Sequence, residues 1–124
     1  MKNLLYFVVS ILAVTLVLAF SAGTIMAADA MPESGDVKVL LENDDVRVAR
    51  ASRPPGTVVP MHTHPAYVAY FFEAWKGKLT NKAGKVVEKE FSAGQVIYSP
   101  GKTHAVEVIG SNNQEVLVIE WKKK

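Results

Sequence analysis

The sequence contains no cysteine and shows no strong excess of either charge. Zero cysteines among 124 residues exclude disulfides, thiolate metal ligands and a cysteine nucleophile. Any bound metal must therefore be held by nitrogen and oxygen atoms. The 14 basic and 12 acidic residues leave a formal net charge of +2. This balance does not indicate a nucleic-acid partner.

A long hydrophobic run lies at the amino terminus. Residues 4–20 are apolar except for one serine and one threonine, and Lys2 supplies positive charge ahead of them. Such a segment is typical of an export signal. Ala28-Asp29-Ala30 predicts cleavage after its last residue, with a cut after Ala27 as the near alternative. An uncleaved membrane anchor is the other alternative, and the charge asymmetry places the rest of the chain outside the cytoplasm in both cases.

We expect three segments. Residues 1–30 form the signal peptide or anchor, and this is the only contact with a membrane if it stays uncleaved. Residues 31–36 form a linker broken by Pro32 and Gly35. Residues 37–124 form one folded domain, whose small core would benefit from a closed barrel or from a homodimer.

After the linker the hydrophobic period is two, not 3.6, which indicates strands. Turn signals such as Pro54-Pro55-Gly56 recur about every ten residues, as in an all-β sandwich or barrel. The segment around residues 79–91 is typical of a hairpin. The expected strands are Val37–Leu41, Val46–Ala51, Thr57–His62, Val68–Ala74, Lys78–Asn81, Val86–Phe91, Gln95–Ser99, His104–Ile109 and Glu115–Trp121.

All three histidines of the chain fall in two places, His62-Thr63-His64 and His104. Residues i and i+2 of a strand point to the same face, so the first pair presents two imidazoles side by side. An imidazole from a neighbouring strand would complete a facial set with positions open for water or substrate. We therefore predict one divalent-metal site at His62, His64 and His104. Hydrogen-bonded core or rim histidines are the alternative.

The sequence resembles the cupin superfamily in two stretches, each a glycine followed by histidine at the family's spacing. The matching residues are Gly56, His62 and His64 in the first motif and Gly94, Pro100, Gly101 and His104 in the second, which is one residue short. HTHPAYVAYFF and SPGKTHAVEVIG are similar to the small cupins that include the β-alanine degradation protein. The resemblance implies a single-domain jelly-roll β-barrel with an internal pocket. The metal would be iron, manganese, zinc, nickel or copper, or the site would be empty.

Two family positions are altered. The glutamate of the first motif should fall at Val68 or Ala69, and the asparagine of the second is Val108. Strand parity directs Glu73 and Glu107 away from the pocket. The expected set is therefore three histidines with no acidic partner, which would leave positive charge on the site and favour an anionic ligand.

Strand parity also predicts the pocket lining. Val58 and Pro60 share the face of His62, and a buried phenol needs a polar partner, so tyrosines are candidates for contacting substrate. For the valines, simple core packing is the alternative. The predicted pocket residues are Val68, Tyr70, Phe72, Tyr98 and Val108.

These residues favour a metal-dependent enzyme that acts on a small anionic organic molecule, and the resemblance to cupin dioxygenases makes oxygenation the favoured reaction. No catalytic base is assigned. One alternative is a non-catalytic exported binding module with a degenerate metal site, as the altered positions suggest. Another is a structural homodimer that uses the aromatic run at residues 70–72.

Overall fold

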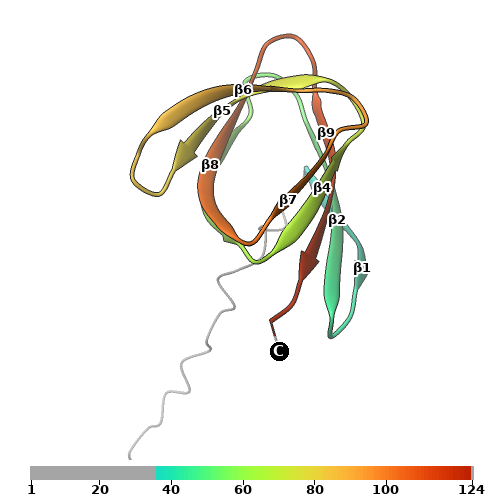
Figure 1. Ribbon diagram of the computed structural model, residues 1–124. Helices are drawn as coiled ribbons and strands as arrows, with labels where there is room; N and C mark the ends of the chain where they lie inside the picture. Colours follow the sequence, from blue (N-terminus) through green and yellow to red (C-terminus); the bar gives the residue numbers. More distant parts are fainter. Residues whose placement is uncertain (1–35, 124) are drawn as a thin grey trace, which may run out of the picture.

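The computed structural model describes residues 36–123 as nine antiparallel strands in two sheets (Figure 1). One sheet has the order β1-β2-β9-β4-β7 and the other the order β3-β8-β5-β6. In these residues there is no helix that is long and apolar enough to cross a membrane. The expected signal segment, and the expected linker apart from Asp36, lie outside the described residues. The strands are β1 (Val37–Glu42), β2 (Val46–Arg53), β3 (Val58–His64), β4 (Tyr67–Phe71), β5 (Trp75–Asn81), β6 (Val86–Phe91), β7 (Val96–Ser99), β8 (Lys102–Ile109) and β9 (Gln114–Trp121).

The all-β fold expected from the period of two is confirmed, and each expected strand has a counterpart. The predicted hairpin is the antiparallel pair β5–β6. The largest differences in bounds are three residues, at the end of β4, which is Phe71 and not Ala74, and at the start of β5, which is Trp75 and not Lys78. Trp75 pairs with Phe91 across the hairpin, and this aromatic contact extends the strand pairing.

The two sheets curve around a shared interior (Figure 1). Alternate residues of β8 and β9 point inward, among them Val106 and Val118, as expected for strands with one face in the core. The buried apolar residues are Val37, Ala49, Ala51, Val59, Tyr67, Ala69, Phe71, Trp75, Phe91, Val106, Val108, Val116 and Val118.

Three aromatic rings form one compact cluster in this interior. Trp75 stacks on Phe91 with ring centroids 4.7 Å apart and planes 9° apart, and Phe71 lies 4.8 Å from Phe91. Gly77 makes room for the indole, since a Cβ at that position would lie 2.5 Å from Cζ3 of Trp75. The cluster therefore depends on the absence of a side chain at Gly77.

A bulge in β3 interrupts the strict alternation of inward and outward side chains that the sequence predicts for that strand. β3 and β8 are in register at Val59 and again at His62, but β3 has two intervening residues where β8 has one. Bulges bend a strand and redirect side chains, and they accommodate proline, here Pro60. Val59 is consequently buried, whereas Val58 is 63% exposed. The expectation that Val58 and Pro60 share the inner face of His62 is wrong.

Candidate metal centre and pocket

The three histidines converge in the interior. His62 and His64 lie on β3, and His104 is the direct cross-strand partner of His62 on β8. Their ring centroids are 4.6 to 5.2 Å apart, and one ligand atom from each lies within 4.8 Å of the others. The convergence predicted from the sequence is confirmed. Binding of a metal stays a prediction.

The hydrogen bonds of His62 and His64 leave two lone pairs facing each other. Nδ1 of His62 donates to the carbonyl oxygen of Pro60 at 2.7 Å, and Nδ1 of His64 donates to the carboxylate of Glu120 at 2.6 Å. Because a carbonyl and an ionised carboxylate only accept, each neutral ring keeps its lone pair on Nε2. The two Nε2 atoms are 2.8 Å apart.

This arrangement requires a proton or a cation between the two nitrogens. With metal–nitrogen bonds of about 2.1 Å, two ligands at right angles around one ion are about 3.0 Å apart. The observed 2.8 Å is close to that separation. The donor set therefore fits a divalent transition metal, and the bulge at Pro60 supplies the carbonyl that orients His62.

His104 also has a buried ring nitrogen without a hydrogen-bond partner among the described residues. It is buried, and its Nδ1 has no hydrogen-bond partner among residues 36–123. Burial, followed by the neighbouring His62 and His64, lowers the pKa of His104 to about 3. Burial is also the main cause of the lowered pKa of His62. Neutral imidazole is the form that coordinates metals, so both rings are in the ligand form at neutral pH.

Glu120 is a site residue that was not predicted. It lies on β9, is 2% exposed, and accepts from Nδ1 of His64 through Oε1. Its Oε2 lies 3.4 Å from Nη1 of the buried Arg47. A carboxylate behind a histidine is the usual support of a metal ligand, because it fixes the ring and raises the basicity of the coordinating nitrogen.

The expected set of three histidines without an acidic ligand agrees with the group of potential ligands among the described residues, but the carboxylate that supports His64 was not expected. The carboxylate reaches the far nitrogen of His64, and it is not part of the group of potential ligands. A signal was present in the sequence: Gln114, Val116, Val118 and Glu120 alternate along β9 and all face inward. The pairing of Glu120 with Tyr67 on β4 places its carboxylate beside His64.

The altered motif position lies at Ala69. Ala69 is buried and borders the cavity, whereas Val68 lies on the opposite face of β4. A methyl group thus stands where the resemblance implies a carboxylate. The structure places Glu73 beyond the end of β4, exposed, and Glu107 outside the barrel within 4.0 Å of Lys78.

A cavity of about 630 Å³ adjoins the histidines. This volume is within the range of small-molecule sites. The aromatic cluster of Phe71, Trp75 and Phe91 forms one wall. Arg53 also borders the cavity and donates through Nη1 to Oε1 of Gln114 at 2.8 Å. The pocket is mostly apolar with a few fixed polar groups.

Tyr67 is the phenol beside the histidines, whereas the sequence predicted Tyr70 and Tyr98 as the tyrosines of the pocket. It is buried on β4, and its ring centroid is 4.8 Å from that of His64. Burial raises the pKa of Tyr67, while a hydrogen bond to Ser99 acts in the opposite direction. The phenol is therefore held in its neutral form beside the candidate metal ligands.

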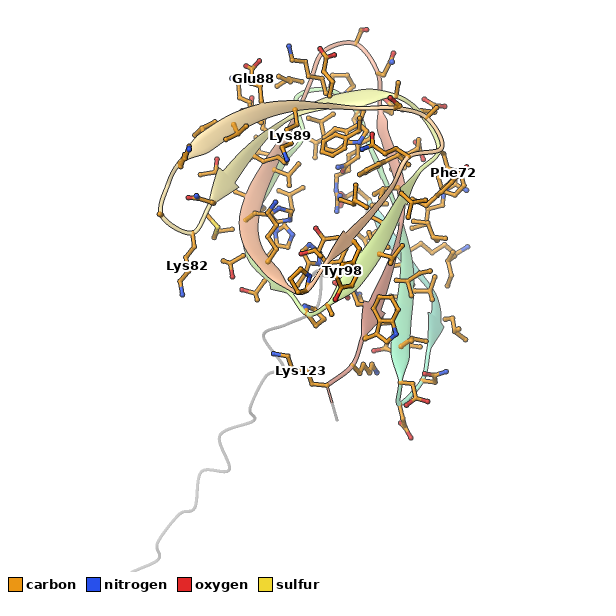
Figure 2. The ribbon with its side chains drawn as sticks, viewed as in Figure 1. Phe72, Lys82, Glu88, Lys89, Tyr98 and Lys123 are labelled. Carbon is orange, nitrogen blue, oxygen red and sulfur yellow. The ribbon has the colours of Figure 1, made fainter. Side chains whose placement is uncertain are left out.

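Most of the predicted pocket residues lie elsewhere. Tyr70 and Phe72 are on the outside, 37% and 40% exposed, with ring centroids 5.0 Å apart. Figure 2 shows Phe72 on the outer side of the barrel. Val68 shares that outer face of β4. Val108 faces inward but is packed in the core and does not border the cavity. Tyr98 borders the cavity at its rim, 68% exposed.

The error has a simple cause. Residues 67–72 are apolar or aromatic on both faces of the strand, so alternation alone does not identify the inner face. The inner face is that of Tyr67, Ala69 and Phe71, because these pack against β9 and the aromatic cluster.

Comparisons with solved structures agree with this all-β fold. A cupin domain from Bordetella pertussis matches with a TM-score of 0.63 and 26% identity over 70% of this chain and 92% of that one. An RmlC-like cupin from Methanocaldococcus jannaschii matches with a TM-score of 0.58 and 19% identity over 75% and 83% of the two chains. The DMSP lyase DddQ of Ruegeria pomeroyi matches with a TM-score of 0.55 and 17% identity over 71% of this chain and 46% of that one.

The structural neighbours are cupin-domain proteins, which supports placing the chain in the cupin superfamily. No family model matches the sequence, and no curated protein matches it. The finer resemblance to the β-alanine degradation group stays a prediction.

Proposed function

We propose that His62, His64 and His104 hold one divalent transition metal and that the protein acts on a small anionic organic molecule in the adjoining pocket. The observation that carries the proposal is the pair of Nε2 atoms of His62 and His64, 2.8 Å apart, with both Nδ1 atoms already donating. A metal ion resolves the conflict between the two lone pairs.

The chain's own groups have separable tasks in this proposal. Glu120 and the Pro60 carbonyl hold two imidazoles in the coordinating orientation. Ala69 leaves space at the place of the motif glutamate. Tyr67 presents a neutral phenol to the pocket. The aromatic wall limits water near the ligand.

A bound metal would supply Lewis acidity, and bound iron would also allow oxygen chemistry. Iron, manganese, zinc, nickel and copper all suit nitrogen ligands. Dioxygenation is the reaction class we favour, by resemblance to cupin dioxygenases with three histidine ligands.

A non-catalytic binding protein is the second candidate, and the alanine at position 69 favours it. Without a carboxylate in that place the ion has one ligand fewer. The same pocket would then capture a small molecule without changing it.

Turnover separates the two candidates. The full chain would be loaded with each of the five metals and supplied with small organic acids under oxygen. Oxygen uptake that depends on one metal and on His104 supports the enzyme. Binding of acids without any metal-dependent turnover supports the binding protein.

Export and dimerisation are proposals of a different kind. Export rests on the sequence of residues 1–30 alone. A homodimer is suggested by an apolar row across the outer face of the five-stranded sheet. Successive cross-strand partners in this row are Leu41, Val48, Ile119, Val68 and Tyr98. Sedimentation velocity at several concentrations would test whether this face pairs two copies.

A further inference from the structure

Two lysines face the interior near the mouth of the pocket. Lys102 lies on β8 two residues before His104, on the same inward face. Lys89 lies on β6 two residues before the buried Phe91, also on the inward face (Figure 2). Both border the cavity. The pocket therefore carries two ammonium groups beyond the histidine cluster.

Lys89 and Lys102 differ from Lys76 and Lys78 in having no acidic partner in the described part of the chain. Lys76 pairs with Glu88 and Glu90, and Lys78 with Glu107, on the outer face of the smaller sheet. Within residues 36–123, neither Lys89 nor Lys102 forms an ion pair.

The inward-facing acid at the histidine end does not neutralise them. Glu120 is engaged by His64 and Arg47, and Glu90, which borders the cavity, pairs with Lys76. Lys89 and Lys102 therefore place two positive charges at the edge of one cavity, and no ion pair is formed by either lysine among residues 36–123. An anionic group between them would offset the repulsion between these two like charges.

We propose that Lys89 and Lys102 form an anion subsite and that the ligand is a small organic dianion. One carboxylate lies at the histidine cluster and the other lies between the two lysines. The inference deepens the proposed function and rests on it for the first carboxylate.

The spacing suits a short diacid. Residues two apart in a strand are separated by about 6.6 Å along the chain, and this is the offset between His104 and Lys102 on β8. Lysine side chains are flexible enough to adjust to spacers of a few carbons. The cavity of about 630 Å³ has room for such a molecule.

The test is calorimetric titration of the full chain loaded with zinc, which has no redox chemistry of its own. Malonate, succinate and glutarate are compared with propionate, butyrate and valerate, so that each diacid has a monoacid of the same carbon number. We expect at least one diacid to bind about tenfold more tightly than its monoacid, as one additional charge-assisted contact provides.

Substitution assigns the preference to the two lysines. Lys89→Met and Lys102→Met keep the length of the side chain and remove its charge. We expect the double variant to lose the preference for the diacid while its zinc content and monoacid affinity are unchanged. Lys82→Met in the exposed β5–β6 turn is the matched control and should bind as the parent does.

Two results would overturn the inference: diacids that bind no better than monoacids, or a preference that survives in the double variant. Failure of the proposed function is a separate result, namely no zinc uptake. In that case the metal-free chain is titrated with the diacids. If the metal-free parent chain binds a diacid and the double variant does not, the lysine subsite is supported. If the metal-free parent chain binds no diacid, the subsite is excluded.

Discussion

The two ends of the barrel interior differ in chemistry. One end holds His62, His64 and His104 with the carboxylate of Glu120 behind them. The other holds the aromatic cluster of Phe71, Trp75 and Phe91, where the buried indole nitrogen of Trp75 has no hydrogen-bond partner among the described residues. Both ends border the same cavity. The comparison indicates that stability and binding rest on different residues of one small core.

The energetics differ as well. The aromatic end gains free energy from apolar burial and ring contacts. At the polar end, the cost of burying Arg47, Glu120 and His64 is offset by their mutual hydrogen bonds, so these groups add little net stability. Substitutions at the aromatic end should therefore affect the fold, and substitutions at the polar end should affect metal binding.

The largest effect is expected for Trp75→Ala. Removing a buried indole leaves a large void and should lower the free energy of unfolding by about 3–5 kcal/mol. Trp121→Ala is the matched control, because Trp121 is exposed on the outer face, and it should cost less than about 1 kcal/mol. Urea unfolding monitored by circular dichroism measures both. Equal losses would contradict the assignment of stability to the aromatic end.

Gly77→Ala should be the next most harmful change. The new methyl would clash with the Trp75 ring, and overpacking of this kind costs about 1–3 kcal/mol. In a Trp75→Leu background the ring is absent, so the same substitution should cost much less. A double-mutant cycle by urea unfolding reports this coupling. Additive losses would show that Gly77 has another role.

Glu120→Gln tests the polar end. The amide cannot replace the charge behind His64, and loss of such a partner typically lowers metal affinity about 10–100-fold. Glu115→Gln on the outward face of β9 is the control and should leave affinity unchanged. Competition with a chromogenic zinc chelator measures both variants. Unchanged affinity in Glu120→Gln would mean that its carboxylate does not support the site.

The smallest effect is expected outside the barrel. Phe72→Ala should cost less than about 1 kcal/mol and should leave zinc affinity unchanged, since Phe72 is exposed and its ring meets Tyr70 and Arg50 on the outer surface. Its sequence neighbour Phe71 is the internal comparison, and Phe71→Ala should cost about 3–5 kcal/mol. If the two variants lost similar free energies of unfolding, the assignment of Phe71 to the inside of the barrel and of Phe72 to the outside would be contradicted.

The sequence predicts the strands and the histidine cluster well, for local reasons. Turn residues divide the chain into runs with a period of two, and the spacing of His62 and His64 places both on one face. The resemblance to cupins then brings His104 to the same place. These features depend on short-range pattern and on a topology that the family shares.

The remaining features depend on contacts that a pattern does not encode. The inner face of β4 is ambiguous because both of its faces are apolar. The bulge at Pro60 shifts the alternation by one residue, and only the pairing of β3 with β8 shows it. Glu120 lies 56 positions from His64, so their contact follows from the sheet order. The pocket lining was therefore less predictable than the histidine cluster.

The central claim is that the three histidines bind a metal, and elemental analysis tests it most directly. The full chain would be purified without a histidine tag and compared with the His62→Ala, His104→Ala double variant at matched folded content. The account predicts close to one divalent transition metal per chain in the parent protein and almost none in the variant. No bound metal in the parent protein, even after reconstitution with each candidate ion, would contradict it.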